Sequence, residues 1–150
     1  MTTAELTPDL GVDERLCLAL HQAARAMTST YRPILAPLGL TYPQYLVMAL
    51  LWEDGTSSVG WIGSRLLLDT NTLSPLLKRL ERLGLVARTR DTDDERIVLV
   101  SLTTAGKRLK RSAADVPAQI GEATGLGLPE QARLVATLRR LTGHLGPRPT

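Results

Sequence analysis

The only cysteine of this chain, Cys17, is the residue whose chemistry most needs an explanation. It lies about one turn inside the start of a segment that predicts a helix, where the helix dipole favours a thiolate. His21 follows on the same helix face, and a protonated imidazole there would also stabilise a thiolate. A lone cysteine in an apolar helix is, however, more often an inert small hydrophobic residue. On these residues alone, a reactive thiol and a packing residue both remain open.

The helix that carries Cys17 is predicted from apolar residues at helical spacing. They follow Asp13, which we expect to be the N-cap, and they extend over about four turns. These residues are Leu16, Leu20, Ala23, Ala24 and Met27. Pro33, Pro37 and Gly39 break the pattern, so only a short helical piece is expected over residues 34–38.

A second helix is predicted to begin at Thr41 or Tyr42, with Pro43 in its first turn. Its apolar residues lie nearly all round the helix, which is typical of a buried helix. They are Tyr45, Leu46, Met48, Ala49 and Trp52. Residues 53–58 then predict a turn.

The next two segments form a helix-turn-helix pattern. Residues 59–67 predict a short helix, and a break at 68–71 precedes an amphipathic basic helix. Leucines spaced by three and four residues form the inner face of that helix, and Gly84 fits the position just after its end. The leucines are Leu73, Leu76, Leu77, Leu80 and Leu83.

After Gly84 the sequence no longer has apolar residues at helical spacing, and the new pattern predicts a hairpin. Residues 85–90 and 97–102 are rich in Val, Ile and Thr, and the polar turn 91–96 separates them. A helix-turn-helix followed by a hairpin is a winged helix. Thr103 or Thr104 then caps a helix that Pro117 and the segment 121–127 interrupt, and a last helix opens at Pro129 and ends at 146–147.

The fold class we expect is mainly α with a small β-hairpin, organised as a single domain over residues 1–150. The winged helix-turn-helix core occupies residues 40–103. The flanking helices, over 10–35 and 104–146, carry apolar stripes that one small core would struggle to cover. We therefore expect them to be dimerisation helices of a homodimer, which would suit a two-fold DNA site.

Composition excludes several classes of protein. Apolar residues make up 43% and charged residues 22%, a globular balance. One cysteine excludes an intramolecular disulfide framework and a multi-cysteine zinc site. We find no metal cluster, phosphate loop or acid–base pair, and expect no metal and no cofactor. No apolar run is long enough for a membrane span, and residues 1–11 lack the features of a signal peptide, so the expected location is the cytoplasm.

The basic charge is concentrated in one block. Residues 78–111 hold ten basic and five acidic side chains, whereas the whole chain has a net charge of only +3. Such a block suggests a polyanionic partner, although a solvated helix face is an equally good explanation from charge alone.

The amphipathic basic helix supplies candidate residues for contact with double-stranded DNA. Short polar side chains at its N-terminus could approach base edges, and its basic residues could contact phosphates. The candidates are Thr70, Asn71, Thr72, Ser74, Lys78 and Arg79. A simpler role for Thr70 and Asn71 is to cap the helix.

The sequence resembles the MarR family of winged-helix regulators over about residues 12–120. The helix TNTLSPLLKRLERL, the following Gly-Leu-Val, the turn Asp94-Glu95-Arg96 and the Leu102-Thr103 step carry this resemblance. Cys17 in LCLAL, the segment TYPQYL, and the stretch from Leu68 to Arg79 resemble the OhrR-type organic hydroperoxide sensors of that family.

The resemblance implies roles for the wing. In the family, the arginine that matches Arg96 enters a minor groove of the operator and is held by the acid that matches Asp94. Without the resemblance, a weak surface ion pair would be the preferred explanation. Arg88 and Arg90, on the preceding strand, are expected to face phosphates or to be structural.

The resemblance also implies a sensing site. The matching cysteine of OhrR-type sensors reacts with peroxide, and tyrosines that match Tyr31 and Tyr42 hydrogen-bond it across the dimer. Relatives often have a third tyrosine where this chain has His21, so this chain departs from the pattern there. No second cysteine is present to form a disulfide, which implies capture of an oxidised Cys17 by a small cellular thiol, or over-oxidation.

Three functions therefore follow as hypotheses. The first is a dimeric repressor that senses organic hydroperoxides through Cys17 and then releases a pseudo-palindromic operator. The second is a MarR-type repressor gated by a small aromatic ligand, with Cys17 structural. The third, a one-cysteine thiol peroxidase, is disfavoured because no activating arginine lies beside Cys17 and a DNA-reading domain would be unexplained; we expect no enzyme activity.

Overall fold

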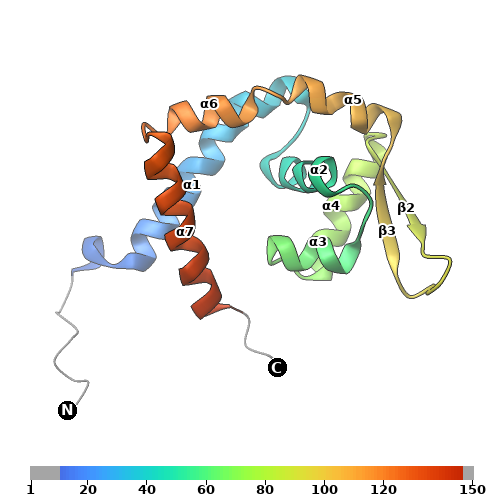
Figure 1. Cartoon of the computed structure of the whole chain (residues 1–150), viewed down its shortest axis with the longest axis horizontal. Helices are drawn as coiled ribbons and strands as arrows, with labels where there is room; N and C mark the ends of the chain where they lie inside the picture. The colour runs from blue at the N-terminus through green and yellow to red at the C-terminus, as the bar shows by residue number, and fades with distance from the viewer. Residues whose placement is uncertain (1–10, 147–150) are drawn as a thin grey trace, which may run out of the picture. The chain divides into compact units, whose positions relative to one another are not determined.

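The computed structural model describes residues 11–146, which are mostly helical with one small sheet (Figure 1). The chain divides into two compact units, Met1–Ser112 and Ala113–Thr150. The first unit contains the predicted winged core together with the first helix and the start of the segment 104–146. The prediction that there is no signal peptide rests on residues 1–11, of which only Gly11 is described. Pro147, at the expected end of the last helix, also lies outside the described residues.

The first helix, α1, begins later and ends later than the sequence pattern predicts. A separate 3-10 turn, η2 (Val12–Glu14), precedes α1 (Leu16–Leu35). The prediction of Asp13 as N-cap is therefore wrong, because Asp13 lies inside that turn and Arg15 takes the cap position without a capping side chain. Pro33 lies within α1 rather than ending it, since its missing N–H removes only one bond near the helix end.

The second helix, α2 (Tyr42–Asp54), begins where predicted, with Thr41 as its N-cap. The 3-10 turn η3 (Ala36–Leu38) and Gly39, at φ 69°, lead into it. The Thr41 hydroxyl accepts from the Gln44 N–H and the Gln44 side chain accepts from the Thr41 N–H, which is a capping box. Val47, Met48 and Leu51 are at most 1% exposed, so α2 is a buried helix, as predicted.

Two helices, α3 (Val59–Leu66) and α4 (Thr70–Arg82), form the predicted helix-turn-helix. Leu67, at φ 52°, turns the chain between them. Leu73, Leu76, Leu77 and Leu80 of α4 are buried, as predicted. The prediction for Leu83 is wrong: its side chain is 51% exposed, because α4 ends at Arg82 and the chain turns away through Gly84 at φ 72°.

The sheet has three antiparallel strands in the order β1-β3-β2. Strands β2 (Val86–Arg90) and β3 (Val98–Leu102) form the predicted hairpin, with Val86 opposite Leu102 and Arg90 opposite Val98. The third strand, β1 (Ser57–Ser58), pairs with β3 at Val100 and Leu99 and was expected to be part of a turn. Two serines carry no alternating pattern, so the sequence offered no signal for this strand.

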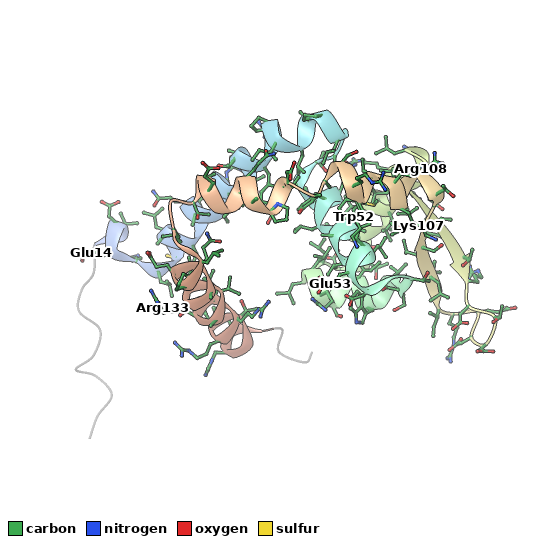
Figure 2. All side chains as sticks on the ribbon, turned by 45° about the horizontal axis from the view of Figure 1, so that its top comes forward. Glu14, Trp52, Glu53, Lys107, Arg108 and Arg133 are labelled. Carbon is green, nitrogen blue, oxygen red and sulfur yellow. The ribbon has the colours of Figure 1, made fainter. Side chains whose placement is uncertain are left out.

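The junction between the hairpin and α5 (Thr104–Ser112) is closed by hydrogen bonds of Thr103. The Thr103 hydroxyl donates to the Gly84 carbonyl (2.6 Å) and accepts from the Gly106 N–H (3.1 Å), which makes Thr103 the cap of α5. The Trp52 indole N–H of α2 donates to the Gly106 carbonyl at 2.9 Å, and Figure 2 shows Trp52 beside α5. These bonds join α2, α4, the hairpin and α5.

The second unit contains α6 (Val116–Ala123) and α7 (Leu128–Leu145). Pro117 lies in the first turn of α6, and Gly125, at φ 68°, separates the two helices. The Gln131 side chain donates to the carbonyls of Gly121 and Leu126 and so ties α7 to the preceding turn. No residue of α7 is buried, although its apolar stripe includes Leu134, Val135 and Leu138.

No single helix within residues 11–146 is long and apolar enough to cross a membrane. The segments Leu16–Leu38 and Tyr42–Asp54 would satisfy that criterion, by length and composition, only as a pair bent by 69°.

Gly106 provides a test of the α5 junction. A Cβ on Gly106 would overlap the carbonyl oxygen of Leu85 and lie 3.2 Å from a methyl group of Leu102. We predict that Gly106→Ala lowers the free energy of unfolding by about 1–3 kcal/mol, because the obstructing atom is backbone and cannot move aside cheaply. Urea unfolding at a fixed protein concentration measures the change.

Gly60→Ala is the matched control, because a Cβ on Gly60 of α3 meets nothing within 4 Å. This variant should be as stable as the unaltered protein or slightly more stable. Equal stability of both alanine variants would contradict the close packing at the junction.

Candidate DNA interface and thiol site

The N-terminal turn of α4 presents short polar side chains to solvent. Asp69, and neither Thr70 nor Asn71, is the N-cap: its carboxylate accepts from the Thr72 N–H at 2.8 Å, and this bond lowers the pKa of Asp69. Thr70, Asn71 and Thr72 are exposed, as are Lys78 and Arg79 farther along the helix. Capping is therefore not the role of Thr70 or Asn71, and their side chains are free to contact a ligand.

A groove of about 430 Å³ lies beside α4 and the hairpin. It brings together four of the predicted DNA-binding residues, which come from two elements and the turn 91–96: Thr70, Ser74, Arg88 and Arg96. Asn71, Thr72, Lys78, Arg79, Arg90 and Asp94 are not among the residues that line it. The groove combines hydroxyl and guanidinium donors, which suit phosphates and base edges.

Arg96 at the tip of the wing is held by Asp94. The Arg96 Nε and Nη2 groups donate to the two Asp94 carboxylate oxygens, each at 3.1 Å, and the Arg96 N–H donates to the same carboxylate. The guanidinium remains 91% exposed while the carboxylate is only 35% exposed. These bonds lower the pKa of Asp94 and raise that of Arg96, so both stay charged at neutral pH. Asp94 orients an accessible guanidinium.

Arg88 and Arg90 have internal partners. Arg88 forms an ion pair with Glu81 at the end of α4, with Nη2 2.8 Å from the carboxylate, and this partner lowers the pKa of Glu81. Arg90 donates to the Glu95 carbonyl at 2.8 Å across the hairpin turn. Both residues brace the wing, which is the structural role that the sequence left open for them.

Cys17 and His21 lie on exposed turns of α1. Cys17 is the second residue of the helix, closer to its N-terminus than predicted, and its thiol is free. His21 is also exposed. Residues four apart on a helix lie about 5–6 Å apart at their Cβ atoms, so the imidazole can approach the sulfur.

Tyr31 and Tyr42 pack against each other at the opposite end of α1. Their ring centroids are 4.6 Å apart, and Tyr45 lies 5.6 Å from Tyr31. Burial, with smaller contributions from Tyr45 and Tyr42, raises the pKa of Tyr31 to about 12, and burial also raises that of Tyr42. Both phenols therefore keep their protons at neutral pH, and within residues 11–146 neither hydroxyl has a hydrogen-bond partner. They are available as donors.

The thiol and the tyrosines do not meet within one chain. Cys17 and Tyr31 are both on α1 (Leu16–Leu35), and fourteen residues of helix span about 21 Å. The structure thus places Cys17 and His21 one helical turn apart near the start of α1, and it packs Tyr31 on Tyr42 near the other end. A complete site of these four residues would require a second chain.

Sequence reasoning missed several residues that line the groove beside α4. Ser58 and Gly60 at the start of α3, and Ile97 and Val98 at the start of β3, contribute to its walls. Ser58 caps α3 by accepting from the Trp61 N–H at 3.0 Å, so a serine before an apolar-periodic run was the available signal for it. Among residues 11–146, no group of His, Cys, Asp and Glu could hold a metal ion.

Known proteins similar to this chain are regulators of transcription. The family profile "Transcriptional regulator SarA/Rot" matches residues 29–112. The "Organic hydroperoxide resistance transcriptional regulator" of Bacillus subtilis is 46% identical over 121 residues, which cover 81% of this chain and 79% of that protein. The "HTH-type transcriptional regulator TtmR" of Methylorubrum extorquens is 47% identical over 137 residues, covering 91% and 70%.

Some solved structures with a similar fold contain bound DNA. Reduced AbfR of Staphylococcus epidermidis bound to DNA is similar with a TM-score of 0.73 and 33% identity, covering 87% of this chain and 91% of that chain. Overoxidized AbfR bound to DNA gives a TM-score of 0.71 and 34% identity, covering 87% and 92%. The helix-turn-helix, the wing and these relatives agree, and the chain belongs to the MarR/SarA-type winged-helix regulators of transcription.

Proposed function

We propose that this transcriptional regulator is a homodimeric repressor that senses organic hydroperoxides through Cys17. It holds a pseudo-palindromic operator while Cys17 is reduced and releases it after oxidation. The observation that carries the proposal is the accessible Cys17 thiol, beside His21, in a chain similar to the organic hydroperoxide resistance regulator of Bacillus subtilis. The regulator acts on DNA, so we infer that it works in the cytoplasm.

The proposed oxidation is a two-electron reaction. The Cys17 thiolate attacks one oxygen of the hydroperoxide, the O–O bond breaks, and the leaving alkoxide takes up the proton that the thiol has lost. The products are a sulfenic acid and an alcohol. Protonated His21 would stabilise the thiolate from one helical turn away. The phenols of Tyr31 and Tyr42, supplied by the second subunit, would donate hydrogen bonds to the sulfur.

The sulfenic acid would then be captured by a small cellular thiol. This step forms a mixed disulfide and releases water, and this chain offers no second cysteine for it. AbfR has been solved on DNA in its overoxidized form, so over-oxidation of that protein is compatible with bound DNA. We therefore assign operator release to the bulkier mixed disulfide.

Dimerisation would involve the helices that the single chain leaves uncovered. Leu16 of α1 is 59% exposed, and Leu134, Val135 and Leu138 of α7 are 47%, 45% and 37% exposed. Burying these side chains against a second copy would supply the hydrophobic free energy that a single chain leaves unused.

Operator contact would come from α4 and the wing. We propose that the exposed and half-buried polar residues of α4 contact DNA and that Arg96, oriented by Asp94, enters a minor groove. The α4 residues are Thr70, Asn71, Thr72, Ser74, Lys78 and Arg79. Arg88 and Arg90 would support the wing and contribute positive potential.

Replacement of Cys17 tests the redox proposal. We predict that cumene hydroperoxide with free cysteine lowers the operator affinity of the unaltered protein roughly 5–150-fold, the usual range of coupling between sites. Cys17→Ser should keep its affinity under the same treatment. Fluorescence anisotropy, with labelled DNA taken from upstream of this protein's own coding sequence, measures both.

Omission of free cysteine is the control for the mixed-disulfide step, since peroxide alone should then release far less DNA. Equal retention of DNA by both proteins with peroxide and cysteine would contradict the redox proposal. That result would favour the alternative of a regulator gated by a small aromatic ligand.

Substitutions in the wing test the DNA contact. We predict that Arg96→Gln weakens operator binding and reduces the slope of log K against log salt concentration by about 1, because one phosphate-associated cation is lost. Titrations at several salt concentrations measure the slope. An unchanged slope and affinity would show that Arg96 stays in solvent.

A comparison of Asp94→Asn with Glu95→Gln separates the loss of one negative charge from the loss of the group that orients Arg96. Both remove one negative charge at the wing tip, but only Asp94 holds the Arg96 side chain. Glu95→Gln should bind the operator at least as tightly as the unaltered protein, whereas Asp94→Asn should bind less tightly than Glu95→Gln. Equal affinities would contradict a positioning role for Asp94.

A further inference from the structure

Helix α5 carries a stripe of positive charge that the proposed operator contact does not use. Its nine residues include four basic side chains and no acidic one: Lys107, Arg108, Lys110 and Arg111. Thr104, Lys107, Arg108 and Arg111 are spaced by three and four residues, so they share one face of the helix. This face is named the α5 stripe. Figure 2 shows Lys107 and Arg108 on α5.

The α5 stripe lines a surface hollow of about 550 Å³. The lining consists of the four stripe residues and Ser112. All four cations of α5 are exposed, and none takes part in the ion pairs found among residues 11–146. Lys110 lies outside the stripe and donates to the Trp52 carbonyl at 3.4 Å. The positive charge of the stripe is therefore not neutralised by an internal salt bridge.

The α5 stripe lies at the opposite end of the winged core from the groove beside α4. Thr70, at the start of α4, and Arg96, at the wing tip, line that groove. The other ends of α4 and the hairpin meet α5, where the Thr103 hydroxyl binds the Gly84 carbonyl at 2.6 Å. The intervening β3 spans about 14 Å and α4 about 20 Å. Figure 1 shows α5 at the base of the hairpin, away from its tip.

The chemistry of the hollow favours a phosphate backbone over a protein partner. Two hydroxyls and three cations supply donors to phosphate oxygens, and no apolar or aromatic side chain lines the hollow. Protein interfaces usually depend on apolar or aromatic anchors at their centre. Cations separated by one helical turn, about 5–6 Å, suit successive phosphates of a nucleic-acid strand.

We propose that the α5 stripe binds the phosphate backbone of a second DNA duplex, independently of sequence, while α4 and the wing hold the first. The regulator would then bridge two DNA segments. This inference rests on the proposed operator contact of α4 and the wing, so bridging would end when oxidation of Cys17 releases the first duplex.

A two-duplex capture experiment tests this proposal. A biotinylated duplex, selected from a random pool for tight binding to the full-length protein, is immobilised and saturated with protein. A fluorescent duplex of unrelated sequence is then added, and its retention is measured over a range of salt concentrations. The unaltered protein should retain the second duplex, and the salt slope should report several phosphate contacts.

The triple variant Lys107→Gln/Arg108→Gln/Arg111→Gln should bind the second duplex on the order of tenfold or more weakly, with a salt slope smaller by about 3. Its affinity for the selected duplex should be unchanged, which also shows that it folds. The matched control is Arg133→Gln/Arg139→Gln/Arg140→Gln, which removes the same charge from exposed positions of α7 and should bridge like the unaltered protein.

Four outcomes would overturn the proposal. The first is that the unaltered protein does not retain the second duplex, and the second is that the α5 variant retains it fully. The third is that the α7 control loses the second duplex as much as the α5 variant does. The fourth is that the α5 variant loses affinity for the selected duplex as much as for the second duplex. The last would place the α5 stripe on the first duplex.

Discussion

The length of one rigid helix constrains how this protein can sense an oxidant. Helix α1 (Leu16–Leu35) carries the Cys17 thiol near its start and Tyr31 near its end, about 21 Å apart. Tyr31 packs on Tyr42 at 4.6 Å, so both phenols are fixed at that far end. A thiol that needs these donors has to take them from another chain. The proposed sensing site and the proposed dimer both follow from this one constraint.

The tyrosine end of α1 is connected to α4 and the hairpin by direct contacts. Tyr45 packs against Tyr31 at 5.6 Å and against Trp52 at 6.2 Å, and the Trp52 indole binds the Gly106 carbonyl at 2.9 Å. Thr103 then joins α5 to Gly84 at the end of α4. A shift of the tyrosines caused by a modified thiol would therefore act on a packed set of elements that ends at α4.

Much of the winged core was predictable because its sequence signals are local. Thr41 and Gln44 form a capping box, the leucines of α4 recur at helical spacing, and Gly84 takes a positive φ. Two wrong predictions concern residues that fit a local sequence pattern but lie beyond the end of the helix to which they were assigned. Asp13 resembles an N-cap but lies in a separate 3-10 turn, and Leu83 continues a leucine spacing after the helix has ended.

The candidate site was only partly predictable for a related reason. Residue types identified Cys17, Tyr31 and Tyr42, but distance along α1, and not sequence pattern, shows that they fall into two separate groups. The residues that brace the wing, such as Glu81 with Arg88, depend on the pairing of α4 with β2, which no single segment encodes.

Mixed dimers of complementary variants test the central claim most directly. Subunits with Cys17→Ser are combined with subunits that carry Tyr31→Phe, and the rate of sulfenic acid formation is measured with a dimedone-based probe. The sole thiol of the mixed dimer belongs to the Tyr31→Phe subunit and faces an intact Tyr31 of its partner. The account predicts that this thiol reacts as fast as in the unaltered dimer, whereas the Tyr31→Phe homodimer reacts more slowly. A mixed dimer as slow as the Tyr31→Phe homodimer would contradict a site completed between two chains.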